Sequence, residues 1–200
     1  MEEIYQIPVG FYQTNCYVIR DEGHVLIIDP GKKAERIASV IQEDDVVDAI
    51  LLTHGHFDHI GAVDELANMF HCPVYLHFDD DELVHQCGYN RMNGYEGSIH
   101  HKITYLMEGH ITIGTFDLEV ISAPGHTPGS VLIIFRQHCF CGDVLFKDSI
   151  GRTDLYGGNE SDMMQTLKMI KTLDRDLLVY PGHGETSTLE RELAYNPFLL

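Results

Sequence analysis

Four short apolar runs in this chain each end in a turn that carries histidine or aspartate. The first run, residues 48–53, leads into His54-Gly55-His56-Phe57-Asp58-His59. The other three lead into glycine-containing turns that present His126, Asp143 and His183. Short apolar runs bounded by turn residues are typical of buried strands. Because α/β folds build their sites at the carboxyl ends of strands, the pattern predicts an α/β protein with these side chains at the ends of its strands.

Hydrophobic periodicity predicts the remaining elements. Alternating or β-branched runs favour strands at residues 15–20, 24–29, 73–76, 111–113, 116–122, 131–135, 139–141 and 177–180. Apolar residues at helical spacing favour helices at 34–42, 60–70, 162–173 and, for a turn or two, 188–195. Residues 79–101 begin with an acidic helical turn and then indicate a surface loop, in which Tyr89, Arg91 and Tyr95 could form a lid. Two strand-rich halves with helices outside predict an α/β sandwich, in a single domain over residues 1–200.

Composition restricts the partners of such a protein. The net charge of −18 would repel nucleic acid and anionic membranes, so neither is expected as a partner. It does not exclude an anionic substrate, because bound metal ions can reverse the local field. The amino terminus lacks a signal-peptide pattern and no stretch is long enough to cross a bilayer, which favours a cytoplasmic protein. The odd number and scattered spacing of the cysteines predict reduced, structural thiols at Cys16, Cys72, Cys87, Cys139 and Cys141.

The residue types at the strand ends are those that bind transition metals. His54 and His56 lie two apart in extended chain, so their rings can point the same way, whereas Asp58 and His59 begin a helix and can face a second point. Imidazole and carboxylate suit zinc, iron or manganese. A capping aspartate among surface histidines would explain the first run alone, but it does not explain four such turns. The other histidines are expected at the surface: His24, His71, His77, His85, His100, His101, His110 and His138.

The combined pattern resembles the metallo-β-lactamase superfamily. The residues that carry the resemblance are His54-x-His56-x-Asp58-His59, His126, Asp143, His183, and Asp29 within Ile28-Asp29-Pro30-Gly31. The resemblance implies an αββα sandwich of two mixed sheets flanked by helices, with two divalent ions, zinc first and iron or manganese as alternatives. It further implies that His54, His56 and His126 bind one ion. By the same resemblance, Asp58, His59 and His183 bind the other ion, Asp143 bridges the two, and Asp29 orients a ligand histidine.

Within the superfamily the chain is most similar to short bacterial hydrolases of the glyoxalase II type, also called hydroxyacylglutathione hydrolase-like. The similarity lies in residues 142–146, 151–152, 181–184 and 196–198. Classical glyoxalase II has an additional helical carboxyl-terminal domain, for which residues 1–200 leave no room. Metallo-β-lactamases themselves typically have Cys or Ser in place of Asp143, so they are expected to be a poorer match.

This resemblance predicts a thioester hydrolase in which a hydroxide bridging the two ions attacks the acyl carbonyl. Asp58 would be the catalytic residue that orients the hydroxide and accepts its proton. A thiol with a pKa of about 8.5 leaves readily as thiolate, which favours a small-molecule thioester such as S-lactoylglutathione over an amide. Candidate substrate contacts are Arg152, Lys147 and Tyr156. Three alternatives stay open: a lactone or ester hydrolase, a persulfide dioxygenase with one iron, and a non-catalytic metal-binding protein.

Overall fold

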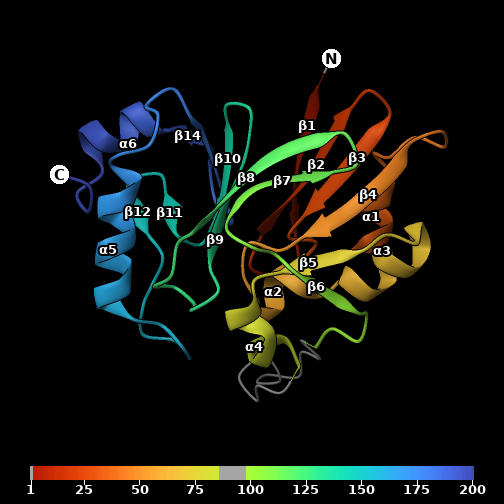
Figure 1. The fold of residues 1–200 in the computed structure, drawn as a ribbon, viewed down its shortest axis with the longest axis horizontal. Coiled ribbons are helices and arrows are strands. Elements are labelled where there is room, and N and C mark those ends of the chain that lie inside the picture. Colours follow the sequence, from red (N-terminus) through yellow and green to blue (C-terminus); the bar gives the residue numbers. More distant parts are fainter. Residues whose placement is uncertain (1, 86–97) are drawn as a thin grey trace.

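Two mixed β-sheets of six strands each lie face to face, with helices on the outer side of both (Figure 1). The computed structural model describes residues 2–85 and 98–200. Cys87 and the proposed lid residues Tyr89, Arg91 and Tyr95 lie outside the described residues. The architecture confirms the αββα sandwich expected from the sequence.

The first sheet is built from the first half of the chain in sequence order, β1 to β6. Its strands span Glu3–Val9, Thr14–Asp21, His24–Ile28, Val46–Leu51, Val74–Leu76 and Ile103–Tyr105. The first three strands are antiparallel neighbours, and β3 to β6 run parallel. Parallel neighbours need crossover connections, and each of these three crossovers contains helix.

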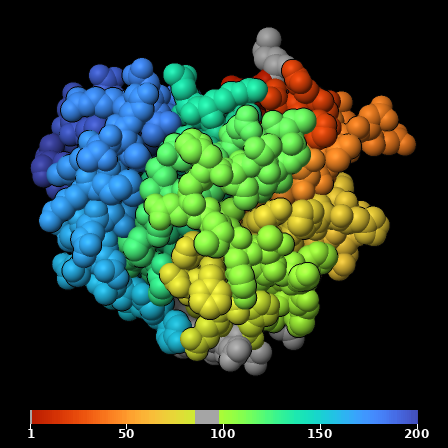
Figure 2. Space-filling view, in the orientation of Figure 1, coloured from red at the N-terminus to blue at the C-terminus, as the bar shows by residue number. Residues whose placement is uncertain are grey.

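The second sheet has the order β14-β13-β10-β9-β8-β7, with only β10 and β13 parallel. In chain order, β7 to β10 span Gly109–Ile113, Phe116–Ser122, Val131–Phe135 and His138–Gly142, and β13 and β14 span Leu178–Pro181 and Ser187–Thr188. A separate hairpin follows β10, formed by β11 (Leu145–Phe146) and β12 (Ser149–Ile150). In the space-filling view the green residues of β7 and β8 run between the two halves of the chain (Figure 2).

The helices cover the outer faces of the sheets. They span Ala34–Ala38 (α1), Phe57–Ile60 (α2), Val63–Phe70 (α3), Asp81–His85 (α4), Glu160–Ile170 (α5) and Leu189–Tyr195 (α6), with a 3-10 turn (η1) at Phe78–Asp80. Helices α1 and α3 lie against the first sheet, and α5 and α6 against the second (Figure 1). None of the helices in the described part of the chain has the length and apolar character needed to cross a membrane.

Alternating side chains on each strand separate three apolar layers. On β2, Tyr17 and Ile19 pack between the two sheets, whereas Val18 packs toward the helices on the outer face. The same alternation continues on β3, where Leu26 and Ile27 lie in different layers. A strand buried on both faces reads as a continuous apolar run, which explains why these segments predicted strands correctly.

Two predicted helices differ from those observed. The helix expected at 60–70 is two helices, α2 and α3. The break lies at Gly61 and Ala62, because the Ala62 amide donates to the carbonyl of Pro30 rather than to a helical partner. A side chain at Gly61 would lie 2.4 Å from the carbonyl oxygen of Gly31, so the two segments are in close contact. Helix α1 ends at Ala38 instead of continuing to residue 42, and turns follow it.

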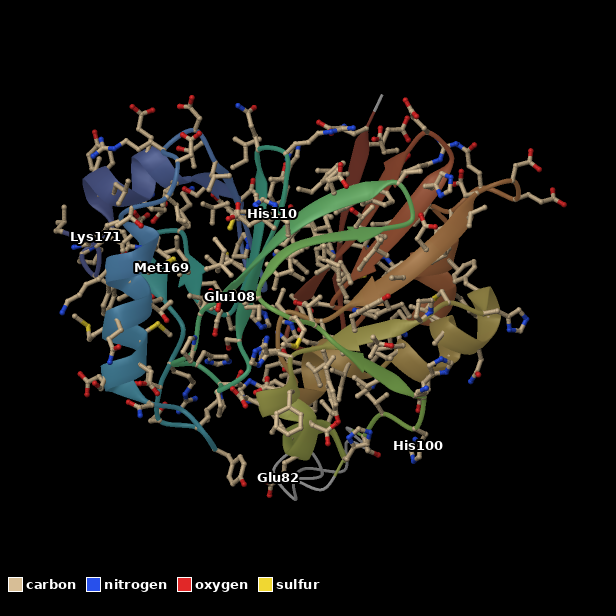
Figure 3. The ribbon with its side chains drawn as sticks, in the orientation of Figure 1. Glu82, His100, Glu108, His110, Met169 and Lys171 are labelled. Carbon is tan, nitrogen blue, oxygen red and sulfur yellow. The ribbon has the colours of Figure 1, made fainter. Side chains whose placement is uncertain are left out.

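The described cysteines lie where the sequence predicted, whereas the histidines outside the strand ends do so only in part. Cys16, Cys72, Cys139 and Cys141 are buried free thiols. Burial raises the pKa of the Cys139 thiol to about 12, which keeps it protonated and unreactive. His71, His100 and His110 are exposed, and Figure 3 labels the last two. The other histidines expected at the surface are half-buried: His24, His77, His85, His101 and His138. The predicted ligand turns follow β4, β8, β10 and β13, so they come from both sheets.

Candidate metal centre

Three buried histidines form the first potential ligand group. His54 and His56 lie in the turn between β4 and α2, and His126 lies in the turn between β8 and β9. One ring nitrogen from each lies within 4.8 Å of the others, and Nδ1 of His56 is 2.8 Å from Nε2 of His126. The turn after β8 is therefore folded onto the turn after β4. Three imidazoles at this spacing can hold one metal ion.

A second potential group lies beside the first and consists of Asp58, His59 and His183. Nε2 of His183 is 3.3 Å from Oδ2 of Asp58, and Nε2 of His59 is 3.7 Å from the same oxygen. The Thr14 hydroxyl donates to Oδ2 of Asp58 at 2.8 Å, and the Tyr12 carbonyl accepts from Nδ1 of His183 at 3.1 Å. The turn between β1 and β2, together with the first residue of β2, thus fixes two members of the group.

Asp143 lies between the two groups. Its Oδ1 is 3.4 Å from Nε2 of His59, and its Oδ2 is 3.5 Å from Nε2 of both His126 and His183. Each of its oxygens therefore reaches a histidine of the second group, and one also reaches the first group. A carboxylate in this position can contact two ions at once. All seven residues that the sequence indicated are brought together.

The donor atoms fit a pair of divalent cations. Nε2 of His54, Nε2 of His59 and Oδ1 of Asp143 are buried and make no hydrogen bond to the described residues. A buried polar atom without a partner costs free energy, and a metal ion would satisfy these atoms together. Imidazole nitrogen and carboxylate oxygen are donors that zinc, iron and manganese accept.

The charge state of the cluster agrees with cation binding. Burial and the neighbouring histidines lower the pKa of His54 well below its usual range and that of His56 to about 3. Both are therefore neutral, the form that binds metals. Burial would lower the pKa of His183 too, but hydrogen bonds to Asp143 and Asp58 raise it to about 9. In the absence of metal, protons supply positive charge where the carboxylates gather, and cations would replace them.

Hydrogen bonds outside the cluster orient the histidine rings. Asp29 Oδ2 accepts from Nδ1 of His59 at 2.9 Å, which turns Nε2 of His59 toward the centre. Asp29 also accepts from the amide and hydroxyl of Thr53 at 2.8 and 2.6 Å, directly before His54. Nδ1 of His126 donates to the carbonyl of Arg152 at 2.8 Å. Such contacts fix the tautomer of a ligand histidine. The sequence indicated the role of Asp29, but not that of the Arg152 backbone.

An open cleft of about 440 Å³ leads to the cluster. Its wall is largely apolar and comes from both halves of the chain: Tyr12, Phe57, Phe146, Ser149, Ile150, Arg152 and Leu155. Of the three predicted substrate contacts, only Arg152 lines this cleft, and its guanidinium also pairs with Asp154 at 2.7 Å. Lys147 pairs with Glu185, and the Tyr156 hydroxyl donates to Glu82 at 3.3 Å.

Comparison with known proteins identifies the family. The family model described as the metallo-beta-lactamase superfamily matches residues 9–183. The chain belongs to the metallo-beta-lactamase superfamily. The matched region contains both ligand groups and Asp143.

Relatives of this superfamily member cover nearly its whole length. It is 38% identical to the probable metallo-hydrolase YqgX of Bacillus subtilis, over 97% of this chain and 96% of that protein. It is 34% identical to the hydroxyacylglutathione hydrolase GloC of Haemophilus influenzae, over 96% of each. Both relatives are named as hydrolases, which supports a place for this chain among the metallo-hydrolases.

Two solved structures have the same fold over the whole chain. The BLEG-1 B3 metallo-beta-lactamase superimposes with a TM-score of 0.90 at 40% identity, over 98% of this chain and 99% of the other. A di-iron-bound form of TTHA1623 superimposes with a TM-score of 0.88 at 35% identity, over 98% and 100%. The similarity to a protein named as a lactamase is greater than the sequence motifs led us to expect. The di-iron form shows that a close structural neighbour holds two iron ions.

Proposed function

We propose that this superfamily member is a hydrolase that uses two divalent metal ions to cleave small-molecule thioesters, with S-lactoylglutathione as the first compound to test. His54, His56 and His126 would hold one ion, and Asp58, His59 and His183 the other. The observation that carries the proposal is the position of Asp143, within 3.5 Å of ligand nitrogens from both groups.

Two ions at these positions would lower the pKa of a bound water and polarise an acyl carbonyl. The protein's own residues do the rest. The pKa of Asp58 is lowered to about 2, because His59 and the hydrogen bonds from His183 and Thr14 outweigh burial, so the carboxylate stays ionised. It can then accept a hydrogen bond from the attacking water and hold it toward the carbonyl. The Thr14 hydroxyl fixes the orientation of that carboxylate.

The cleft is suited to a small acyl group. Phe57, Phe146 and Ile150 give the wall beside the cluster an apolar surface, and Arg152 also lines the cleft. A thiol leaves as thiolate at neutral pH, because its ordinary pKa is about 8.5, and it needs little help from a general acid. The relative GloC, named as a hydroxyacylglutathione hydrolase, supports the same choice.

The test is thiol release by the purified protein loaded with zinc, manganese or iron, with metal content measured on the same samples. We expect two ions per chain and turnover of S-lactoylglutathione or another acyl thioester. A lactone, a β-lactam and a glutathione persulfide complete the panel. A two-ion protein that turns over none of the thioesters would contradict the proposal. One iron per chain with oxygen uptake on the persulfide would favour a dioxygenase.

A further inference from the structure

Asp80 is a fully buried carboxylate that takes no part in the chemistry proposed above. It ends the 3-10 turn η1, directly before α4, and its exposed fraction is 0%. Helix α4 lies at the edge of the molecule, where Figure 3 labels Glu82. Three donors surround the Asp80 carboxylate. The Gly55 amide and the Thr127 hydroxyl donate to Oδ2 at 2.7 and 2.8 Å, and the Gly129 amide donates to Oδ1 at 2.7 Å.

These donors come from the two turns that carry the first ligand group. Gly55 lies between His54 and His56, and Thr127 directly follows His126. One carboxylate therefore joins the turn after β4 to the turn after β8. The turn after β8 donates a hydrogen bond to each of the two carboxylate oxygens. Nδ1 of His56 and Nε2 of His126, which approach to 2.8 Å, lie on the two turns that Asp80 joins.

The glycines in both turns make the approach of Asp80 possible. A Cβ atom at Gly129 would lie 2.7 Å from the amide nitrogen and carboxylate of Asp80. A Cβ atom at Gly55 would lie 3.3 Å from Cβ of Asp80 and 2.8 Å from Val84 of α4. Real Cβ atoms do not approach other atoms as closely as 2.8 Å. The absence of a side chain at Gly55 and Gly129 is therefore explained by Asp80 and α4.

The second ligand group is held by other contacts. Asp29 orients His59, the Thr14 hydroxyl contacts Asp58, and the Tyr12 carbonyl contacts His183. Within the described part of the chain, the hydrogen bonds of the Asp80 carboxylate go to Gly55, Thr127 and Gly129 and to none of these residues. Loss of Asp80 should therefore affect the two groups unequally.

We propose that Asp80 is a positioning residue that sets the spacing between the His54–His56 turn and the His126 turn, and thereby the affinity of the three-histidine group for its ion. The inference rests on the ligand assignment proposed above, but not on the identity of the substrate. Contacts that orient ligands in this way are worth about 10- to 100-fold in metal affinity.

The test is the substitution Asp80→Asn, which keeps the size of the side chain. Its amide presents a donor in place of one oxygen, so either the Gly55 or the Gly129 amide loses its acceptor. We expect one of the two ions to bind about 10- to 100-fold more weakly and the other to bind as in the unchanged protein. Metal-free protein would be titrated with Co²⁺ against a competing chelator, and the absorption spectrum of bound Co²⁺ would report the geometry of each centre.

The matched control is Glu192→Gln. Glu192 is also a fully buried carboxylate with backbone and side-chain donors, but it contacts neither ligand-bearing turn. Both substitutions should lower the melting temperature of the metal-free protein, whereas only Asp80→Asn should lower the affinity for one of the ions. Thr127→Val removes one of the three hydrogen bonds to Asp80. It should lower the affinity for the same ion by a smaller factor.

Three results would overturn the inference: unchanged affinity for both ions in Asp80→Asn, equal weakening of both, or the same weakening in Glu192→Gln. Binding of fewer than two ions by the unchanged protein would overturn it together with the ligand assignment. No substrate is used, so failure to hydrolyse thioesters would contradict the proposed function alone and leave the role of Asp80 standing.

Discussion

At the scale of single residues, the site depends on a carboxylate that two ligand groups share. Asp143 follows β10 and reaches His59, His126 and His183 within 3.5 Å. His59 and His183 lower the pKa of Asp143 well below its usual range, although burial alone would raise it. The ionised form of the carboxylate is therefore favoured in the folded protein, and it supplies negative charge at the point where two cations would approach each other.

Replacing this residue tests the shared position directly. Asp143→Ala should reduce the metal content from two ions per chain to one or none and lower thioester turnover by more than about 100-fold, because both centres lose a ligand. Metal analysis after gel filtration and steady-state assays would measure this. The control is Glu119→Ala, an exposed carboxylate on β8, which should change neither quantity. Retention of two tightly bound ions by Asp143→Ala would contradict the shared position.

The sequence predicted which residues gather at the site better than it predicted what holds them. The seven histidines and aspartates were recognisable because each follows closely on one of four apolar strands. Asp80, Thr14 and the Arg152 carbonyl were not, because their roles arise from contacts between turns far apart in the chain. Asp80 lies within an acidic segment that reads as a solvated helical turn. Only the three donors around it distinguish it from its exposed neighbour Asp79.

At the scale of elements, close contact between two turns decides where α2 begins and ends. Gly31 follows β3, and a Cβ atom there would lie 1.7 Å from the backbone oxygen of Asp58. The same contact explains the break between α2 and α3, which periodicity alone could not indicate. Apolar spacing continues across Gly61 and Ala62, and the interruption comes from a tertiary hydrogen bond to Pro30.

The substitution Gly31→Ala should therefore displace α2 and destabilise the protein. We expect the free energy of unfolding of the metal-free protein to fall by about 2 kcal/mol or more, since a well-packed site has no room for the methyl group. Gly23→Ala is the matched control. Gly23 has positive φ, unlike Gly31, but no atom lies within 4 Å of its added Cβ, so the only expected loss there is the backbone strain of about 1 kcal/mol. Equal losses of unfolding free energy in the two variants, measured by urea unfolding, would contradict the close contact at Gly31.

Helix α6 holds the β11–β12 hairpin, whose Phe146 and Ile150 line the cleft. Glu192 on α6 accepts from the Asp148 amide at 2.8 Å and from Asn196 at 3.0 Å, and Asn196 donates to the carbonyls of Phe146 and Ser149. Burial would raise the pKa of Glu192, but hydrogen bonds from Ser187, the Asp148 amide, Asn196 and Arg191 lower it overall. The ionised form is therefore favoured by folding.

This shift gives a pH-dependent prediction. A carboxyl whose pKa is lowered in the folded state stabilises the protein above its unfolded-state pKa of about 4.3 and loses that contribution as the pH falls. Glu192→Gln should cost about 2 kcal/mol of unfolding free energy between pH 6 and pH 8, and the difference from the unchanged protein should shrink below about pH 4.3. Urea unfolding of metal-free samples at several pH values measures this. A difference that does not change with pH would contradict it.

At the scale of the whole molecule, the first half of the chain forms one sheet and the second half forms the other. The sequence allowed the fold class to be predicted, because apolar runs followed by histidine or aspartate occur in both halves of the chain. It did not allow the order of the strands within each sheet to be predicted. The edge strand β6 and the hairpin β11–β12 consist of two or three residues each, too few for a periodic pattern to indicate.

Removing metal should therefore affect the entire fold. If each ion is present at about 100 times its dissociation constant, it stabilises the folded protein by about 2.7 kcal/mol. For a chain of this length that corresponds to a rise of roughly 5–10 °C in melting temperature per ion. Calorimetry before and after treatment with a chelator, and again after readdition of zinc, would measure the change. A melting temperature that is the same in all three samples would show that the cluster binds no ion tightly.

The placement of the ligands on both sheets has a mechanical consequence. An ion held by His54, His56 and His126 joins the two sheets, and Asp143 and His183 extend that connection to β10 and β13. The metals would then act as removable cross-links that close long loops of chain, and the entropy lost by the unfolded chain grows with the length of the loop that is closed. The proposed catalytic centre would then also hold the two faces of the cleft at a fixed position relative to each other.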